Sequence, residues 1–269
     1  MSTILEQIVG DKRNALPRWK AEFPEADLRR EVTCSDRDFF AAIIARRPAY
    51  ILECKQASPS QGTLRAGFDL DGIAKVYARH ATCISVLTEE NHFGGRMEHL
   101  QQVRRQVNQP VLNKDFFFDP YQVWLGRKFG ADAILLMLSV LDDSQWRELA
   151  SLAGELGMAV LTEVASDDEM ERARTLGAKL IGINNRDLHT LQIDLGRTRR
   201  LAEKAPPGAV LISESGYRTR GDIESNLELV QGFLIGSSLM SQPDLEMAVR
   251  SLLVNVEAAG AEVVKEKQL

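Results

Sequence analysis

The sequence predicts an α/β protein of the (β/α)8 class, a TIM barrel, with an N-terminal helical extension. Three observations predict this fold. Short apolar runs of strand length occur eight times along the chain, stretches with helical periodicity separate them, and the length is 269 residues. A single barrel of this class takes about 250 residues. With 44% apolar and 26% charged residues, the composition is that of an ordinary globular protein.

The eight apolar runs are the predicted strands. Most of them are apolar throughout rather than alternating, which is typical of parallel strands that are covered on both faces. They occupy residues 49–54, 82–87, 110–113, 133–137, 158–162, 179–183, 209–213 and 232–236. Eight strands that alternate with helices close most naturally into a barrel. A doubly wound open sheet is the alternative.

Helices are predicted in the intervals, where apolar residues recur three and four positions apart. The clearest cover residues 69–80, 96–107 and 142–156. Ser166 and Glu169 have the spacing of a capping box, which predicts that another helix begins there. Ser241, which is followed by Pro243, predicts the start of the last helix.

The chain divides into three parts. Residues 1–48 precede the first strand and are predicted to form an extension that packs on one end of the barrel. Helical patterns cover residues 3–20 and 36–46 of it, with a link that contains Pro and Glu between them. The barrel is predicted over residues 49–256, and residues 257–269, rich in Ala, Glu and Lys, predict a frayed helical tail.

Charge and cysteine content exclude several classes of protein. The chain has 38 acidic and 33 basic residues and a net charge of -5. A nucleic-acid-binding protein usually has a basic excess or stripe, and since neither occurs here, we expect no nucleic-acid partner. Cys34, Cys54 and Cys83 include no C-x-x-C pair, which argues against a disulfide framework and a zinc site.

Membrane and export signals are also missing from the sequence. The longest apolar stretch covers residues 133–141, whereas a membrane span needs about 20 residues. The N-terminus has no basic region followed by an apolar one, so no signal peptide is expected. The sequence therefore predicts a cytoplasmic protein without a membrane partner.

Charged and amide side chains occur where several predicted strands end. In barrels of this class the active site lies at the C-terminal ends of the strands. The side chains in question are Glu53, Lys55, Lys114, Glu163, Asn184 and Glu214. Each one alone could be a solvated loop charge or part of an ion pair. As a set at equivalent strand positions they predict a catalytic cluster, in which a lysine can have a lowered pKa and a glutamate a raised one.

Small residues follow the last two predicted strands and indicate a phosphate-binding site. Ser215 and Gly216 follow the seventh strand, and Gly236 and Ser237 follow the eighth. A lone Gly-Ser pair is better explained by a tight turn. After the last strands of a barrel, however, such residues leave backbone N–H groups free, and barrels often bind phosphate there.

Motifs for other chemistries are absent from the sequence. It contains no G-x-G-x-x-G, no P-loop, no G-x-S-x-G and no H-E-x-x-H. Nucleotide binding, a hydrolase nucleophile elbow and a zincin metal site are therefore unsupported.

The strand ends and their neighbours resemble indole-3-glycerol phosphate synthases. The matching stretches are ILECKQASPSQG (51–62), SVLT (85–88), NKDF (113–116), DPYQ (119–122), LTEV (161–164), GINNRDL (182–188), ISESG (212–216) and FLIGS (233–237). Together, the E-x-K-x-A-S-P-S-x-G and I-N-N-R-D-L patterns are highly specific. The resemblance covers essentially the whole chain, including the N-terminal extension.

The resemblance implies a decarboxylating ring closure in tryptophan biosynthesis. In this family 1-(2-carboxyphenylamino)-1-deoxyribulose 5-phosphate becomes indole-3-glycerol phosphate, with loss of CO2 and water. The partner is thus a small phosphorylated substrate, and no cofactor and no metal are expected. Some bacteria fuse this barrel to phosphoribosylanthranilate isomerase. Because the chain ends about where that second barrel would begin, the resemblance predicts a monofunctional protein, and we expect a monomer.

The resemblance also assigns roles to the strand-end residues. Lys114 matches the general acid of the family, and Glu163 matches its partner carboxylate. Lys55 matches a second lysine whose share of the acid work stays open. Glu53 would hold the lysines protonated and oriented.

Further positions match residues that bind the substrate. Asn184 and Glu214 would bind the sugar hydroxyls or the nearby lysines, and Ser58 and Arg186 would meet an anion, either carboxylate or phosphate. An apolar wall for the aromatic ring is expected from Phe93, Phe116, Leu135 and Leu188. The phosphate end is expected at Ser215, Gly216, Gly236 and Ser237.

The chain departs from the family pattern at two positions. The family often has Lys where this chain has Gln56 and Gln61. Losing two positive charges near the loop after the first strand would weaken the electrostatic steering of an anionic substrate. None of the residues assigned to chemistry departs.

Two alternative functions stay open at this point. An isomerase that acts on a related sugar phosphate typically has an Asp and Cys pair or two Asp at its strand ends, whereas this chain has Lys and Glu there. A non-catalytic barrel that binds an anion or a partner would tolerate loss of some of these polar residues, and none is lost.

Overall fold

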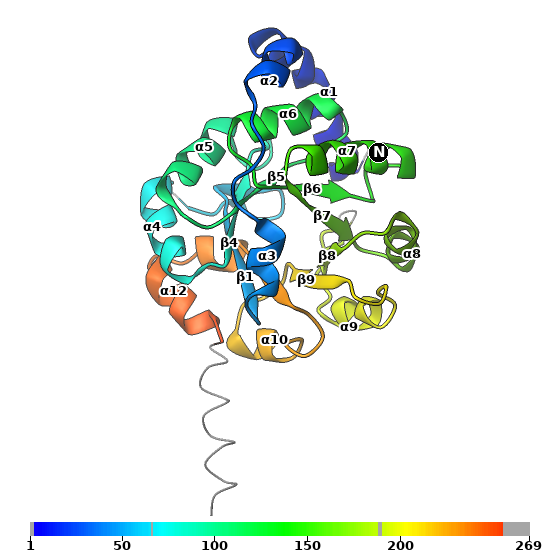
Figure 1. Cartoon of the computed structure of the whole chain (residues 1–269). Coiled ribbons are helices and arrows are strands. Elements are labelled where there is room, and N and C mark those ends of the chain that lie inside the picture. Colours follow the sequence, from blue (N-terminus) through cyan, green and yellow to red (C-terminus); the bar gives the residue numbers. More distant parts are fainter. Residues whose placement is uncertain (1–2, 66, 188–189, 255–269) are drawn as a thin grey trace, which may run out of the picture.

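Eight parallel strands close into a barrel in the order β1-β10-β9-β8-β7-β6-β5-β4, which confirms the predicted fold class (Figure 1). The computed structural model describes residues 3–65, 67–187 and 190–254. The strands are β1 (Ala49–Cys54), β4 (Cys83–Leu87), β5 (Val111–Lys114), β6 (Ala133–Met137), β7 (Ala159–Val164), β8 (Leu180–Asn184), β9 (Val210–Glu214) and β10 (Gly232–Ile235). The open sheet is excluded because β1 pairs with both β4 and β10.

Two hydrophobic layers explain why the strands are apolar on both faces. Alternate residues point to opposite sides of a strand. On β1, Ile51 belongs to the cluster inside the barrel, whereas Leu52 belongs to the cluster between the strands and the helices. The interior cluster also includes Cys83, Leu112, Leu135, Leu161, Leu180, Ile212 and Leu234. Every strand therefore has one row of side chains that points to the barrel axis.

Helices surround the barrel, as Figure 1 shows. They are α4 (Leu70–His80), α5 (Met97–Gln106), α6 (Pro120–Lys128), α7 (Asp143–Glu155), α8 (Asp167–Leu176), α9 (Gly196–Ala202), α10 (Arg220–Glu224), α11 (Ser237–Met240) and α12 (Leu245–Leu252). Those predicted over residues 69–80, 96–107 and 142–156 correspond to α4, α5 and α7. Each of these helices buries its apolar stripe against the strands, as Leu100 and Val103 of α5 illustrate.

One predicted helix start is confirmed, although without its full capping box, and another is wrong. Ser166 caps α8 by accepting a hydrogen bond from the Glu169 amide at 3.3 Å, but the Glu169 carboxylate accepts from the Ala165 amide, so the capping box is incomplete. The last helix starts after Asp244 instead of near Ser241. The Asp244 side chain accepts from the Met247 amide at 2.9 Å, and this bond fixes the first turn of α12.

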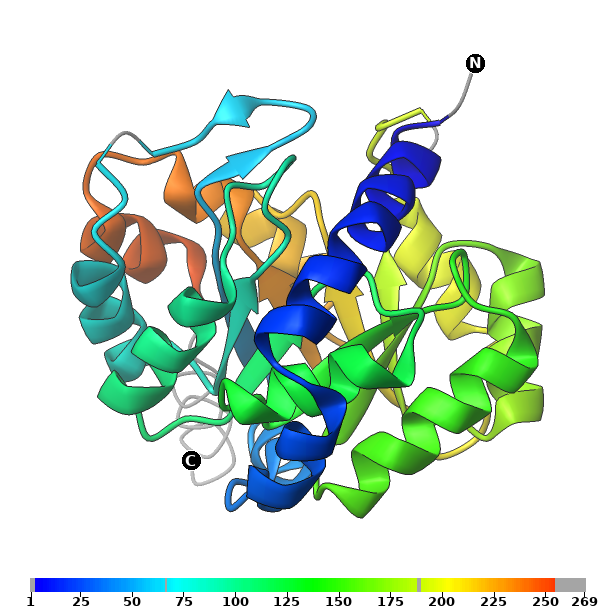
Figure 2. The same ribbon diagram turned by 90° about the horizontal axis from the view of Figure 1, so that it is seen from above.

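The N-terminal residues form three helices, α1 (Ile4–Glu22), α2 (Glu25–Glu31) and α3 (Phe39–Ile44). The helix α2 lies in the segment that the sequence suggested as a link, where only Leu28 is buried. Phe39 and Ile43 of α3 join the cluster inside the barrel, so α3 closes the end where the strands begin. Figure 2 shows α1 running along the side of the barrel, with its N-terminal end at the opposite end from α3.

A short hairpin follows β1 at the end where the strands finish (Figure 2). Its strands are β2 (Ala57–Ser58) and β3 (Gly62–Thr63). The Ala57 amide donates to the Phe93 carbonyl at 3.1 Å, which joins the hairpin to the loop after β4. The division at residues 48 and 256 stays a prediction, and the predicted tail 257–269 lies outside the described residues. Within the described ranges, no helix is long and apolar enough to cross a membrane.

Candidate active site

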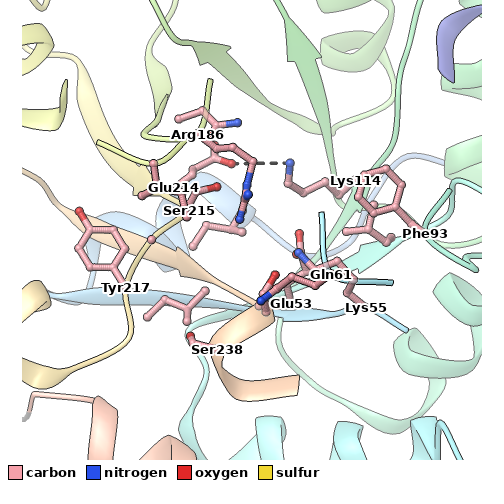
Figure 3. A pocket seen from close by; sticks show the side chains of 18 of the residues that line it. Glu53, Lys55, Gln61, Phe93, Lys114, Arg186, Glu214, Ser215, Tyr217 and Ser238 are labelled. Atoms are coloured by element: carbon pink, nitrogen blue, oxygen red, sulfur yellow. Dashed lines mark hydrogen bonds and ion pairs between the residues drawn. The ribbon is translucent and has the colours of Figure 1, made fainter. Parts of the chain in front are cut away.

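A cavity of about 420 Å³ opens at the C-terminal end of the barrel. It is lined by residues from all eight barrel strands or the loops that follow them, and Figure 3 shows the side chains of many of these residues. Of the predicted site residues, it contains Glu53, Lys55, Phe93, Lys114, Phe116, Leu135, Glu163, Asn184, Arg186, Glu214, Ser215, Gly216, Gly236 and Ser237. The structure thus brings together most of the residues that the sequence singled out.

The polar cluster continues the inward-pointing rows of the strands. Lys114 comes two residues after Leu112, and Glu163 and Glu214 come two residues after Leu161 and Ile212. Because side chains on a strand alternate, each polar residue points to the same side as the interior residue before it. Their convergence is therefore a consequence of barrel closure.

Lys114 lies between two carboxylates. Its Nζ is 3.4 Å from Glu163 Oε2 and 3.7 Å from Glu214 Oε2. Burial by itself would lower the pKa of Lys114, but the charges of Glu163, Glu214 and Glu53 together raise it above its ordinary value. The lowered lysine pKa that such sites can show is therefore not found here, and Lys114 is an ammonium group with a proton to donate.

Lys55 forms a separate pair with Glu53. The distance from Lys55 Nζ to Glu53 Oε1 is 2.7 Å, and the Glu53 side chain is 3% exposed. The other oxygen, Glu53 Oε2, is buried and has no hydrogen-bond partner among the described residues. Since a buried carboxylate oxygen without a donor is costly, this atom is available to a hydroxyl or an ammonium group of a ligand.

Glu214 and Glu163 differ in their surroundings. Burial raises the pKa of Glu214 to about 8, the charge of Lys114 opposes this shift, and the charges of Glu163 and Glu53 add to it. Glu163 Oε1 accepts a hydrogen bond from Asn184 Nδ2 at 3.0 Å, so Asn184 orients the carboxylate that faces Lys114. Asn184 was expected to bind a sugar hydroxyl or a lysine. Among the described residues its side-chain amide donates to Glu163, and a bond to a sugar hydroxyl stays a prediction.

Two glycines leave space for the carboxylates of Glu214 and Glu53 because they have no side chain. A Cβ atom on Gly182 would lie 2.0 Å from Glu214 Oε1, and one on Gly236 would lie 2.5 Å from Glu53 Oε1. Gly236 was a predicted phosphate residue, whereas Gly182 was not a predicted site residue. Its signal in the sequence was a glycine in the inward row of an otherwise apolar strand.

The loop after β9 has an unusual backbone at the predicted phosphate end. Ser215 has φ of 67° and Gly216 has φ of 97°. A Cβ atom on Gly216 would lie 2.6 Å from Ile193 Cγ2, so glycine is needed for both conformation and space. Ser215, Gly216, Gly236 and Ser237 all line the cavity, as do Ser238 and Arg218, and they follow the paired strands β9 and β10.

An apolar wall lies on the other side of the cavity. The rings of Phe93 and Phe116 are 6.1 Å apart between centroids, and Leu135 lies in the same wall. Leu188, which was predicted for this wall, is outside the described residues. Leu87, Met137 and Ile193 also line the cavity, and nothing in their sequence context distinguished them from core residues.

A family model described as indole-3-glycerol phosphate synthase matches residues 5–252. The chain belongs to the indole-3-glycerol phosphate synthase family. The match includes the N-terminal helix α1 as well as all eight strands of the barrel. The resemblance seen in the sequence is therefore confirmed.

Curated relatives of this chain carry the name tryptophan biosynthesis protein TrpCF. The relative from Vibrio cholerae is 54% identical over 254 residues, which are 94% of this chain and 54% of that protein. The relatives from Yersinia pestis and Salmonella typhi are 51% and 50% identical, again over 94% of this chain. The chain spans about half the length of the curated relatives it matches.

Ser58 is the predicted residue that lies apart from the main cavity of this family member. It lines a smaller cavity of about 70 Å³, together with Lys55, Arg186 and residues of α1 such as Ile8. The Ser58 hydroxyl is buried and has no hydrogen-bond partner in the part of the chain that the structure describes. Phe93, Phe116, Arg186 and Ser237 line both cavities, so the two spaces adjoin.

Two further polar residues line the cavity. Arg218 was not predicted from the sequence, and Gln61 was noted only as a departure from the family pattern. Arg218 lines the cavity next to Ser215 and Gly216, and its position two residues after the Ser-Gly pair was the available signal. Gln61 lines the cavity as well, whereas Gln56 does not. Arg186 is held by the Leu191 carbonyl at 3.2 Å, with its guanidinium at the mouth.

Proposed function

We propose that this chain is an indole-3-glycerol phosphate synthase, a decarboxylating lyase of tryptophan biosynthesis. It would convert 1-(2-carboxyphenylamino)-1-deoxyribulose 5-phosphate to indole-3-glycerol phosphate, CO2 and water. The observation that carries the proposal is the Lys114 ammonium, held 3.4 and 3.7 Å from two carboxylates in the cavity of a family member. A protonated lysine is suited to give a proton to a developing alkoxide.

The shape of the cavity suggests how the substrate binds. The phosphate would bind at Ser215, Gly216, Gly236 and Ser237, with Arg218 as an additional cation. The aromatic ring would lie against Phe93 and Phe116. This arrangement puts the ribulose chain across the middle of the cavity, between Lys114 and the pair of Lys55 and Glu53. The substrate carboxylate would then face Ser58 and Arg186, where the unpartnered Ser58 hydroxyl can donate a hydrogen bond.

Ring closure would use Lys114 as the acid. The aryl carbon that bears the carboxylate forms a bond to the carbonyl carbon C2′, and the carbonyl oxygen takes a proton from Lys114 Nζ. The negative charge that develops on that oxygen is stabilised by the ammonium group before the proton moves. Loss of CO2 then leaves its bonding electron pair in the ring and restores aromaticity.

Dehydration would complete the indole. The bond from C2′ to the new hydroxyl breaks as an acid protonates the leaving oxygen, and a base removes a proton from C1′. Lys114 or Lys55 would be the acid, and Glu163, which Asn184 orients, would take part as the carboxylate partner. Glu53 would hold Lys55 in position, and Glu163 and Glu214 would hold Lys114 in position and favour its protonated form.

The test is a fluorescence assay for indole-3-glycerol phosphate with purified protein in EDTA. Product formation supports the reaction, the substrate and independence from metal ions together. Binding of the substrate without turnover would contradict the enzyme and favour the anion-binding barrel. Isomerisation of a related sugar phosphate without indole emission would favour the isomerase. That the protein is a monomer and that it acts in the cytoplasm both stay predictions.

A further inference from the structure

A buried polar network lies directly behind the loop that contains Ser215 and Gly216. Its central member is Asn185, which is 0% exposed and follows Asn184 in the chain. The network also includes Ser213, Thr198, Tyr217 and Asn226, all of them buried. Ser213 lies in β9 and Thr198 in α9. Asn185, Tyr217 and Asn226 lie in the segments that follow β8, β9 and α10. The proposed chemistry uses none of these side chains.

Asn185 uses its whole amide group within this network. Its Nδ2 donates to Ser213 Oγ at 3.0 Å and to the Ser215 carbonyl at 3.2 Å. Its Oδ1 accepts from the Thr198 amide at 3.2 Å and from the Thr198 hydroxyl at 2.9 Å. Asn185 is therefore fixed in one orientation, and one of its four bonds reaches the loop that lines the cavity.

The loop needs such a contact because Ser215 has a left-handed backbone. Its φ of 67° is a conformation that residues other than Gly, Asn and Asp rarely adopt. A strained backbone of this kind persists only when its surroundings hold it in place. The contact from Asn185 to the Ser215 carbonyl holds a residue that lines the cavity end proposed for phosphate.

We infer that Asn185 is a positioning residue, which holds Ser215 and Gly216 in the conformation that binds the substrate phosphate. The inference rests on the proposed function, since that function puts the phosphate at this loop. Asn226 belongs to the same network but lies at its far side. It donates to Tyr217 Oη at 3.3 Å, and no hydrogen bond joins its side chain to Ser215 in the described part of the chain.

This difference supplies a matched pair of variants in the full chain, Asn185→Ala and Asn226→Ala. Both remove a buried amide, so both should lower the melting temperature. Only Asn185→Ala should weaken binding of inorganic phosphate, measured by calorimetry, and raise the KM of the phosphorylated substrate. We expect about a tenfold change in both, with kcat altered far less, because the lost contact and the relaxed loop act on phosphate rather than on Lys114.

A rescue variant separates positioning from general damage. Glycine adopts φ near 67° without strain, so Ser215→Gly should make phosphate affinity less dependent on Asn185. The loss caused by Asn185→Ala should therefore be smaller in the Ser215→Gly protein than in the wild type. If Asn185→Ala does not fold, Asn185→Asp keeps the shape and the acceptor for Thr198 but lacks the amide hydrogens.

Three results with the variants overturn the inference. These are equal phosphate affinity in wild type and the Asn185 variants, an equal loss in Asn226→Ala, and the same loss with and without Ser215→Gly. Wild-type protein that binds no phosphate also overturns it. Wild-type protein that binds phosphate but forms no indole-3-glycerol phosphate contradicts the proposed function instead, and the phosphate affinities then still decide the role of Asn185.

Discussion

Lys114 lies close to Glu163 and Glu214, and the charges of nearby carboxylates set the chemistry of single residues in the site. The raised pKa of Lys114 follows from Glu163, Glu214 and Glu53 acting against the effect of burial. The same crowding, added to burial, raises the pKa of Glu214. Lys114 therefore holds its proton more firmly than an isolated lysine, and Glu214 takes one up more readily than an ordinary glutamate.

Replacing Lys114 by Met should remove the acid while keeping most of the side-chain volume. We expect kcat/KM to fall by about a hundredfold or more, because general acid catalysis contributes on that scale. Lys128→Met is the matched control, since Lys128 forms its ion pair with Glu31 on the surface at 2.6 Å. Steady-state indole fluorescence measures both, and similar rates for the two variants would contradict the role of Lys114.

The pH dependence of kcat/KM should have one limb from a carboxylate and one from a lysine. Activity should fall on the acid side as the base is protonated. The alkaline limb should lie above the ordinary lysine pKa of 10.5, because the carboxylates favour the protonated form of Lys114. A rate that does not change from mildly acidic to alkaline pH would argue against this pairing of acid and base.

Glu214 should make the folded protein less stable as the pH rises. Its pKa is about 8 when folded and 4.5 in the unfolded reference, so the folded state binds the extra proton between these values. The stabilisation is present below 4.5 and is lost as the pH rises through about 8. Urea unfolding at several pH values should show wild type losing stability relative to Glu214→Gln across this window, by on the order of a few kcal/mol. A constant difference would exclude a raised pKa.

At the scale of elements, the helix α1 joins the N-terminal segment to the active site. Lys12 of α1 forms an ion pair with Asp115 at 2.7 Å, and Asp115 directly follows Lys114 on the chain. Asp115 also accepts from the Thr88 hydroxyl and from the Phe116 amide. Ile4, Leu5 and Ile8 reach the smaller cavity beside Phe93 and Phe116. The position of α1 is therefore coupled to the end of β5.

Lys12→Met should destabilise the protein more than a matched change on the same helix. Asp115 is 5% exposed, so losing Lys12 leaves a buried carboxylate without its counter-charge, at a cost of about 2 to 3 kcal/mol. Lys20→Met breaks the more exposed pair with Asp119 and should cost about 1 kcal/mol or less. Chemical unfolding compares the two, and equal losses would mean that the Lys12 pair contributes no more than a surface contact.

At the scale of the whole molecule, the barrel closes within this chain. The strand β1 pairs with β10 on one side and β4 on the other, so no strand of the barrel has an unpaired edge. The relatives named TrpCF are nearly twice as long as the matched region. The active-site cavity, however, is lined by residues of this chain from every strand or the loop after it.

The 269-residue chain should therefore fold and turn over substrate without an added partner. We expect one cooperative unfolding transition, a mass near 30.0 kDa by sedimentation and a specific activity that does not depend on protein concentration. Activity that appears only with an added isomerase, or only at high protein concentration, would contradict this expectation and show that the site needs a second chain.

The sequence by itself determined the barrel and most of its active site. Continuous apolar runs and helical periodicity are local patterns, and both survive in the structure because each strand is buried on two faces. Polar residues such as Lys114 and Glu163 stood out because they interrupt apolar strands at their ends. Strand alternation and the barrel topology then fix where such residues point, so their convergence was predictable.

Only the tertiary structure decided the pairing and the electrostatics within the site. Three features depend on distances between segments that are far apart in the sequence. Asn184 bonds Glu163, the pKa of Lys114 is raised rather than lowered, and Ser58 lies in a neighbouring cavity. The position of Asn185 also depends on the tertiary structure. Asn184 lines the cavity, whereas the side chain of Asn185 lies in the buried polar network. Coulomb energies and hydrogen bonds change over an ångström, whereas periodicity specifies only which face a residue is on.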